Sequence, residues 1–81
     1  MLHDLKTASS RAVGMKQTIR AINTGNVSVV YLARDTDDHI SKRVTKECRK
    51  AGVEIIIADS MEALGMACGI QVGAATAALL K

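Results

Sequence analysis

The stretch Val27-Ser28-Val29-Val30-Tyr31-Leu32-Ala33 decides the fold, because it is rich in β-branched residues and almost continuously apolar. Such a run is typical of a central strand that is buried on both faces of a sheet. Residues 53–58, with the sequence VEIIIA, form a second run of this kind and predict another buried strand. Strands of this type need helices on both faces of the sheet to cover them.

Helical patterns flank these two strands. The short, polar segment at residues 3–10 predicts a first helix. Two later segments repeat apolar residues at the spacing of one helical face, and a glycine follows each of them as a stop signal. A fourth helix is expected from Ser60, a favourable N-cap, through Ala67. The two apolar stripes are Met15, Ile19 and Ile22 before Gly25, and Ile40, Val44, Cys48 and Ala51 before Gly52.

The alanine-rich segment at residues 71–80 has two interpretations. Its alanines favour a helix by propensity. We predict a strand instead, because the two preceding strands need a sheet and small side chains let helices approach it closely. Residues 11–13 are a further short candidate strand, leading into Gly14. The order of elements predicts an α/β fold, a three-layer α/β/α sandwich with a small four-stranded mixed sheet, in a single domain over residues 1–81.

The composition restricts the function classes. With 81 residues, the chain is long enough for one small domain only. It has no Phe, no Trp and one Tyr, so binding by stacking bases on aromatic rings is not expected. No apolar run reaches the roughly 18 residues that a membrane span needs, and no secretory leader opens the chain. We therefore expect a cytoplasmic protein without a membrane partner, with Cys48 and Cys68 reduced.

The charge is unevenly distributed along the chain. The net charge is +3 at pH 7, which mildly favours polyanionic partners. Residues 39–50 carry five basic side chains against Glu47, and residues 1–34 also carry a basic excess. A basic first half suggests a binding face, although such runs are solvated helix faces in most proteins.

The segment Gly14-Met15-Lys16-Gln17-Thr18-Ile19-Arg20 is the first candidate site. Gly14 precedes the expected helix start, where free N–H groups form an anion site. Lys16 and Arg20 share one helical face, and Lys, Arg and Gln side chains hydrogen-bond to purine edges. The segment therefore suits the recognition of purine edges, and the alternative is a solvated polar face after a turn glycine.

The second candidate is the segment at residues 64–72, LGMACGIQV. Ile70 and Val72 are apolar where a loop is expected, and loop residues are mostly polar. They either form an apolar tip that packs against a flipped-out base or a partner, or turn inward to complete the core.

Catalytic and metal-binding motifs are scarce. Asp35-Thr36-Asp37-Asp38 lacks the glycine and the closing glutamate of a calcium loop, so helix capping explains it better. Neither cysteine has an evident activating base, and no glycine-rich phosphate loop is present. We expect a protein that is not an enzyme and has no metal or cofactor. A small α/β protein-interaction or nucleotide-binding module is the alternative, the latter encouraged only by Asp35 after a strand.

The motifs and the element order resemble the kink-turn RNA-binding ribosomal protein family, of the large-subunit seven-Ae and thirty-e type. The resemblance rests on residues 13–18 (VGMKQT), on Gly25, on the strand to Ala33 with Asp35, and above all on residues 64–75 (LGMACGIQVGAA). It covers residues 3–80 and is greatest to the small stand-alone bacterial members. The family fold is an α/β/α sandwich.

The resemblance implies a partner and a set of contacts. Family members bind the kink-turn, a bent RNA duplex with tandem sheared G·A pairs and one extruded nucleotide. The implied partner is thus a structured RNA with a kink-turn, ribosomal or riboswitch-like. Apart from the resemblance, a monomer is the default expectation for so small a basic domain. Many relatives have Asn-Glu in place of Lys16-Gln17, and many have a proline in place of Asp38. The implied RNA-binding residues are Gly14, Lys16, Gln17 and Arg20 for the guanines, Gly69, Ile70, Gln71 and Val72 for the extruded nucleotide, and Arg34 at the border.

Overall fold

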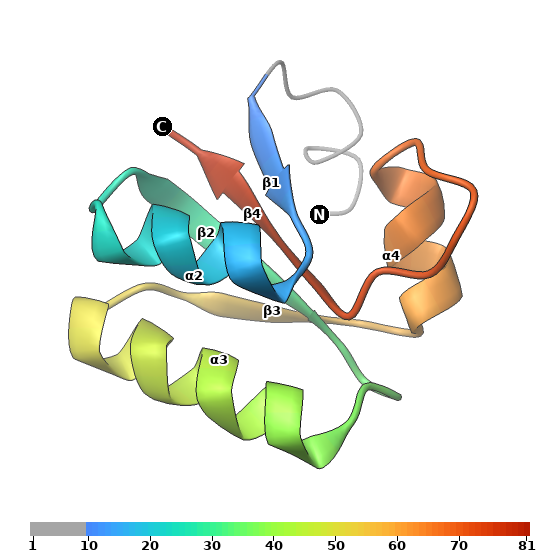
Figure 1. Ribbon diagram of the computed structural model, residues 1–81, viewed down its shortest axis with the longest axis horizontal. Coiled ribbons are helices and arrows are strands. Elements are labelled where there is room, and N and C mark those ends of the chain that lie inside the picture. The colour runs from blue at the N-terminus through green and yellow to red at the C-terminus, as the bar shows by residue number, and fades with distance from the viewer. Residues whose placement is uncertain (1–9) are drawn as a thin grey trace.

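The computed structural model describes residues 10–81, which form four strands and three helices. The helix expected at residues 3–10 lies outside the described residues, except for Ser10, which precedes the first strand. The elements are β1 (Arg11–Val13), α2 (Met15–Asn23), β2 (Val27–Ala33), α3 (Asp38–Ala51), β3 (Ile55–Ala58), α4 (Met61–Ala67) and β4 (Thr76–Leu80) (Figure 1).

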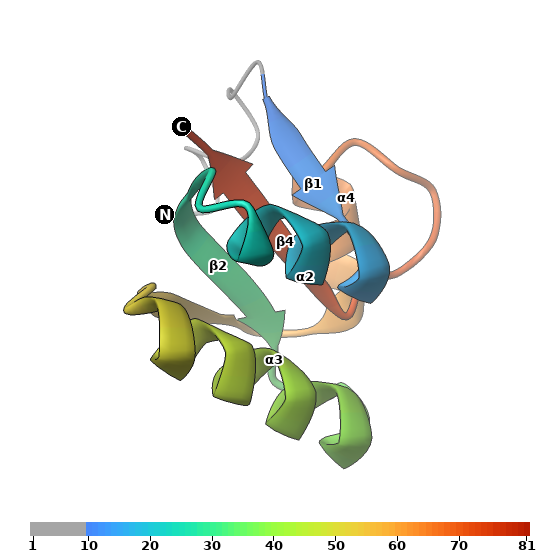
Figure 2. The ribbon, with the colours of Figure 1, turned by 60° about the vertical axis from the view of Figure 1, so that its left-hand side comes forward.

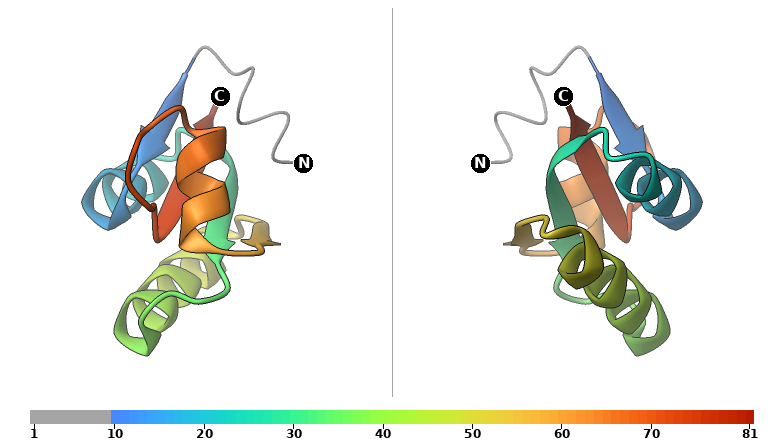
Figure 3. Two further views of the ribbon diagram at one scale, coloured as in Figure 1. Left: turned by 90° about the vertical axis from the view of Figure 1, so that its right-hand side faces the viewer. Right: turned by 90° about the vertical axis from the view of Figure 1, so that its left-hand side faces the viewer.

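The four strands form one mixed sheet in the order β1-β4-β2-β3. Strands β2 and β3 are parallel and are joined by α3, whereas β4 is antiparallel to both β1 and β2. Helices α2 and α3 cover one face of the sheet and α4 covers the other (Figures 1 and 3). The predicted α/β/α sandwich with a small four-stranded mixed sheet is confirmed.

Strand β2 lies inside the sheet and is buried at every position except Ser28. Tyr31 packs in the cluster beneath α4, whereas Val30 and Leu32 pack in the cluster beneath α2 and α3. An irregularity in the pairing next to Ser28 lets Val27 join this second cluster. The prediction of a central strand buried on both faces is confirmed.

Strand β4 confirms that the alanine-rich segment is a strand, although a shorter one than predicted. It lies between β1 and β2, and Ala77 and Ala78 are fully buried in the clusters on opposite faces. The strand begins only at Thr76. The Ala74 N–H donates to the Met61 carbonyl oxygen at 3.0 Å, so the chain is still bound to α4 at Ala74 and joins the sheet only from Ala75, whose carbonyl oxygen accepts the Ala33 N–H.

Strand β3 is an edge strand, so the prediction of a strand buried on both faces is wrong here. The strand starts at Ile55, and Ile57 is 51% exposed. Only β2 pairs with it, and the outer side of an edge strand lies beyond the cover of the helices. An apolar, β-branched run therefore indicated the strand correctly but not its position in the sheet.

Candidate nucleic-acid interface

The start of α2 exposes three of the side chains singled out in the sequence. Lys16, Gln17 and Arg20 are all exposed. Gly14 precedes the helix with a φ of 94°, a conformation that residues with a side chain rarely adopt. Its N–H donates to the Thr76 carbonyl oxygen at 2.9 Å, which fixes the helix start against the beginning of β4.

The first turn of α2 has no capping side chain and no acidic residue. The other two helices differ, because Asp37 accepts the His39 N–H at 3.0 Å at the start of α3, and Ser60 accepts the Ala63 N–H at 3.0 Å at the start of α4. Of the three helices within residues 10–81, α2 alone begins with its positive end unsatisfied by a side chain. This helix start therefore suits an anion or a polar base edge.

The loop after α4 partly buries one of its apolar residues and exposes the other. Ile70 packs against the cluster beneath α4, and its N–H donates to the Gly65 carbonyl oxygen at 3.1 Å. Val72 is 71% exposed, and Gly69 and Gln71 are exposed as well. Each of the two alternatives from the sequence therefore holds for one residue: Ile70 turns inward and completes the core, whereas Val72 projects into solvent.

Two glycines to which the sequence assigned no role let this loop lie directly on α4. A Cβ built on the buried Gly65 would overlap the carbonyl oxygen of Val72 and lie 3.1 Å from its carbonyl carbon. A Cβ built on Gly73 would lie 3.2 Å from the Cβ of Met61. The regular spacing of Gly65, Gly69 and Gly73 was the available signal, but spacing alone does not show which backbone approaches them.

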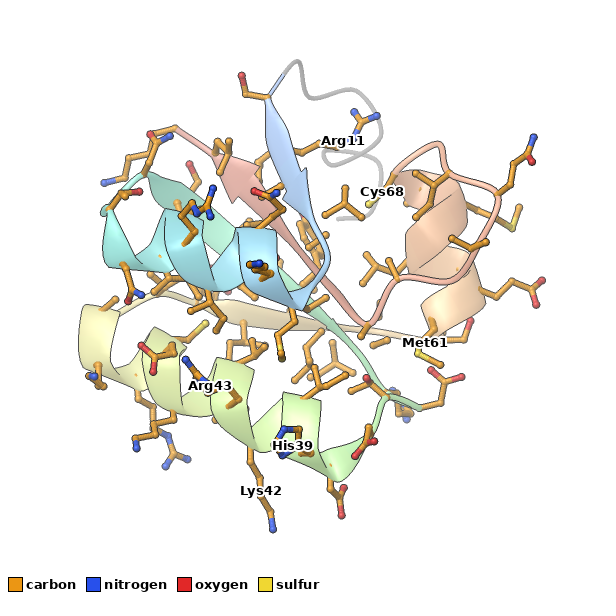
Figure 4. All side chains as sticks on the ribbon, viewed as in Figure 1. Arg11, His39, Lys42, Arg43, Met61 and Cys68 are labelled. Carbon is orange, nitrogen blue, oxygen red and sulfur yellow. The ribbon has the colours of Figure 1, made fainter. Side chains whose placement is uncertain are left out.

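Arg11 ties the end of α4 to β1. Its Nη2 donates to the Cys68 carbonyl oxygen at 2.8 Å in a partly buried position, and Cys68 is the C-cap of α4 (Figure 4). The last turn of α4 contains no basic residue, so Arg11 supplies the cation that favours a helix C-terminus. Sequence reasoning missed Arg11 because the two partners are 57 residues apart.

We expect Arg11→Met to lower the free energy of unfolding by about 1–2 kcal/mol, because a partly buried, charged hydrogen bond is lost. The amides of Gly69 and Ile70 should exchange faster with solvent, because the loop loses its tie to β1. Urea denaturation and native-state hydrogen exchange measure the two effects. Arg11→Lys keeps the charge but not the planar donor group and should restore only part of the stability. Unchanged exchange at Gly69 and Ile70 would show that Arg11 does not position the loop.

Arg34 and Asp35 follow the end of β2. Arg34 is exposed, and its backbone N–H donates to the Ala58 carbonyl oxygen at 2.9 Å. The Asp35 Oδ1 accepts the Met61 N–H at 2.7 Å, so this carboxylate helps to cap α4. Asp35, which encouraged the nucleotide-binding alternative, therefore has a structural function in the fold.

A hollow of about 670 Å³ lies beside α4 and the loop that follows it. Its wall combines apolar side chains with two carboxylates and an amide. The lining residues are Asp35, Met61, Glu62, Met66, Ile70, Gln71 and Gly73. A planar group with apolar faces and polar edges fits this combination of apolar and polar lining residues.

Backbone hydrogen bonds bring the separate candidate segments together. Gly14 bonds to Thr76, and the Ala33 N–H donates to the Ala75 carbonyl oxygen at 2.8 Å. The start of α2, the end of β2 and the end of the loop therefore meet at one end of the strands. Figure 2 shows the first turn of α2 and the loop after α4 on the same side of the molecule.

The thiols of the chain are not activated. Cys48 and Cys68 are buried and free. Burial raises the pKa of both thiols; Glu47 adds to the rise at Cys48, and the Arg11 guanidinium opposes it at Cys68. A raised pKa keeps a thiol protonated, which is its unreactive form.

Within residues 10–81, no group of three or more His, Cys, Asp or Glu side chains is placed to hold a metal ion. No helix in this part of the chain is long and apolar enough to cross a membrane.

Known proteins resemble the chain over most of its length. Residues 2–81 match the Ribosomal protein L7Ae/L30e/S12e/Gadd45 family. An RNA-binding protein of Caldanaerobacter subterraneus subsp. tengcongensis is 46% identical over 68 residues, which are 84% of this chain and 83% of the relative. The RNA-binding protein YbxF of Geobacillus stearothermophilus is 45% identical over 74 residues, 91% of this chain and 90% of the relative. The structure of a Giardia lamblia 15.5kD RNA binding protein matches with a TM-score of 0.87 and 25% identity, covering 99% of this chain and 68% of that one. With the fold, the sequence motifs and the family match in agreement, the chain belongs to the ribosomal protein L7Ae/L30e/S12e/Gadd45 family.

Proposed function

We propose that this chain is a non-enzymatic RNA-binding protein that recognises the kink-turn and stabilises its bent form. One structural observation carries the proposal: the uncapped, basic start of α2 and the apolar loop after α4 lie on the same side of the molecule (Figure 2). Family membership and the names of the relatives support it. The proposal takes residues 1–81 as one domain, acting as a monomer in the cytoplasm.

Helix α2 supplies the groups that contact the guanines. The exposed Lys16 and Gln17 lie in its first turn, and Arg20 follows on the same exposed side. Lys and Arg donate to guanine O6 and N7, and the Gln amide both donates and accepts. The unsatisfied N–H groups at the helix start add a fixed positive potential, and Gly14 lets the RNA approach the backbone.

The loop after α4 receives the extruded nucleotide. A base that leaves its stack loses contacts on both faces, and a protein must replace them. Val72 is exposed, and its chain neighbours Gln71 and Gly73 line the hollow together with Met61, Met66 and Ile70. These apolar side chains, of which the two methionines are flexible, take the place of the aromatic rings that other RNA-binding folds use.

Binding acts on the RNA by shifting its conformational population. A free kink-turn samples bent and extended forms, and a protein that binds only the bent form favours it by its differential affinity. Phosphate contacts then set affinity and salt dependence, while guanine contacts set specificity.

A gel-shift titration at one stated salt concentration tests the proposed function. A short kink-turn RNA is compared with a control RNA in which Watson–Crick pairs replace the sheared G·A pairs. We expect a strong preference for the intact kink-turn. Equal affinity for the two RNAs would mean that a basic surface meets a polyanion without recognising the kink-turn.

Val72→Asp tests the loop without disturbing the core. Because Val72 is 71% exposed, the free energy of unfolding should stay within about 0.5 kcal/mol of the wild-type value. Affinity for the kink-turn should fall about tenfold, since an apolar contact is lost and a negative charge faces RNA. Val72→Ile should bind like the wild type, and equal affinity of the Asp variant would remove Val72 from the interface. Ile70 is a poorer probe, because it also packs in the core.

A further inference from the structure

The net positive charge of the protein resides on α3. This helix carries five of the eleven basic residues and two of the eight acidic ones, so its net charge is +3 and that of the remaining chain is zero. Long-range attraction between the protein and a polyanion therefore originates mainly at α3 and not at the start of α2.

The basic side chains of α3 are exposed, whereas the acidic side chain among them is not. Glu47 has a side chain only 12% exposed, which lies 3.6 Å from the Arg43 Nε and 3.9 Å from the Lys50 Nζ. Within residues 10–81, Lys42, Lys46 and Arg49 form no ion pair. We call these three residues the basic row.

The basic row faces away from the body of the protein. Val44 and Cys48 form the buried side of α3, and Figure 4 shows Lys42 extending away from the sheet. Residues at this spacing lie on one helical face, and about 10 Å of helix separates Lys42 from Arg49. With Ser41, Thr45 and Lys50, the row lines a shallow hollow of about 390 Å³. The row thus presents several positive charges to one solvent-facing surface.

Two of the three residues of the basic row, Lys42 and Lys46, do not serve the stability of α3, whereas Arg49 lies in the last turn, where the dipole favours a cation. Like charges four residues apart, as at Lys42 and Lys46, disfavour a helix. Lys42 also lies in the N-terminal half of the helix, where the dipole favours negative charge. An arrangement that the helix itself does not favour is suited to a partner of opposite charge.

We infer that the basic row is a second RNA-docking surface, which binds the phosphate backbone of an RNA duplex that contains no kink-turn. The partner chemistry follows from charge complementarity, since a duplex backbone presents regularly spaced negative charges to a row of this kind. The inference goes beyond the proposed kink-turn site, because it concerns another helix and does not require Lys16, Gln17 or the loop.

Two double variants with equal net charge test the inference. Lys42→Gln/Lys46→Gln removes two charges from the basic row. Arg43→Gln/Lys81→Gln removes one charge paired with Glu47 and one at the exposed C-terminus. Glutamine is a good helix former, and circular dichroism checks that both variants fold. Fluorescence anisotropy then measures their affinity for a plain RNA duplex between roughly 50 and 200 mM salt.

We expect the basic-row variant to bind the plain duplex about tenfold more weakly at low salt than the control variant does. The slope of log affinity against log salt should fall by about 2 in the basic-row variant and stay near the wild-type value in the control. Equal affinities and slopes in the two variants, or no binding of the plain duplex by the wild type, would overturn the inference. If the wild-type protein shows no preference for the kink-turn over its Watson–Crick control RNA, the proposed function is refuted and this inference is not. The reason is that the plain-duplex comparison does not depend on kink-turn recognition.

Discussion

Gly65→Ala is expected to destabilise the protein, although alanine is the better helix former. Propensity alone predicts a gain of about 1 kcal/mol in a helix interior. Gly65 is buried in α4, and the added Cβ would overlap the Val72 carbonyl oxygen and lie 3.2 Å from the Gly73 Cα. These are backbone atoms, which cannot rotate away, so the whole loop must move. We expect the free energy of unfolding, measured by urea denaturation, to fall by about 1–3 kcal/mol.

The same substitution should weaken kink-turn binding about tenfold, because the loop that receives the extruded nucleotide is displaced. Met66→Ala is the control for stability alone, since Met66 is the next residue of α4 and is 68% exposed, whereas its place in the lining of the hollow excludes it as a control for binding. Its effect on stability should stay within about 0.5 kcal/mol. A Gly65→Ala protein as stable as the wild type, with unchanged amide chemical shifts at Val72 and Gly73, would show that the loop does not lie against α4.

Lys16→Ala is expected to weaken binding to the intact kink-turn by about 1–3 kcal/mol, the usual effect of losing a contact to a base edge. The mutant's affinity for the Watson–Crick control RNA should change much less, so the ratio of the kink-turn affinity to the control affinity should decrease. Stability should be unaffected, because Lys16 is exposed at the start of α2. Gel-shift titrations with both RNAs over a range of salt concentrations measure these quantities.

Lys81→Ala is the control for Lys16→Ala. Lys81 is an exposed lysine that follows β4, at the end of the strand away from the Gly14–Thr76 contact. We expect its kink-turn affinity to equal that of the wild type. If Lys16→Ala weakens binding to both RNAs equally and lowers the slope of log affinity against log salt by about 1, Lys16 contacts a phosphate and not a guanine. Unchanged affinity and slope would place Lys16 outside the site.

Much of the fold could be predicted because its signals are local. The apolar run at residues 27–33 indicated a strand buried on both faces, since residues are buried on both sides only in the interior of a covered sheet. The stripe containing Val44 and Cys48 indicated α3, and Gly52 indicated its end, where the observed φ is 70°. Each signal depends on a few neighbouring residues and on the geometry of the helix or strand they form.

The candidate site was only partly predictable. The residue types at Lys16, Gln17 and Arg20 suggested base recognition, and the resemblance assigned the loop at residues 69–72 to the same RNA. That Ile70 packs inward while Val72 projects depends on the path of the loop over α4, which needs the absence of a side chain at Gly65. No pattern within the loop itself contains that information.

The sequence by itself therefore determined the helices and strands of residues 10–81, the buried sides of β2, α2 and α3, and the residue types that are available to meet RNA. The order of the strands, the edge position of β3 and the hydrogen bond from Arg11 to Cys68 appear only in the folded chain. The physical reason is that periodicity and propensity act between close neighbours, whereas strand pairing and loop packing join residues far apart in sequence. The pairing of β4 with both β1 and β2 brings the start of α2 and the loop after α4 to one side of the molecule.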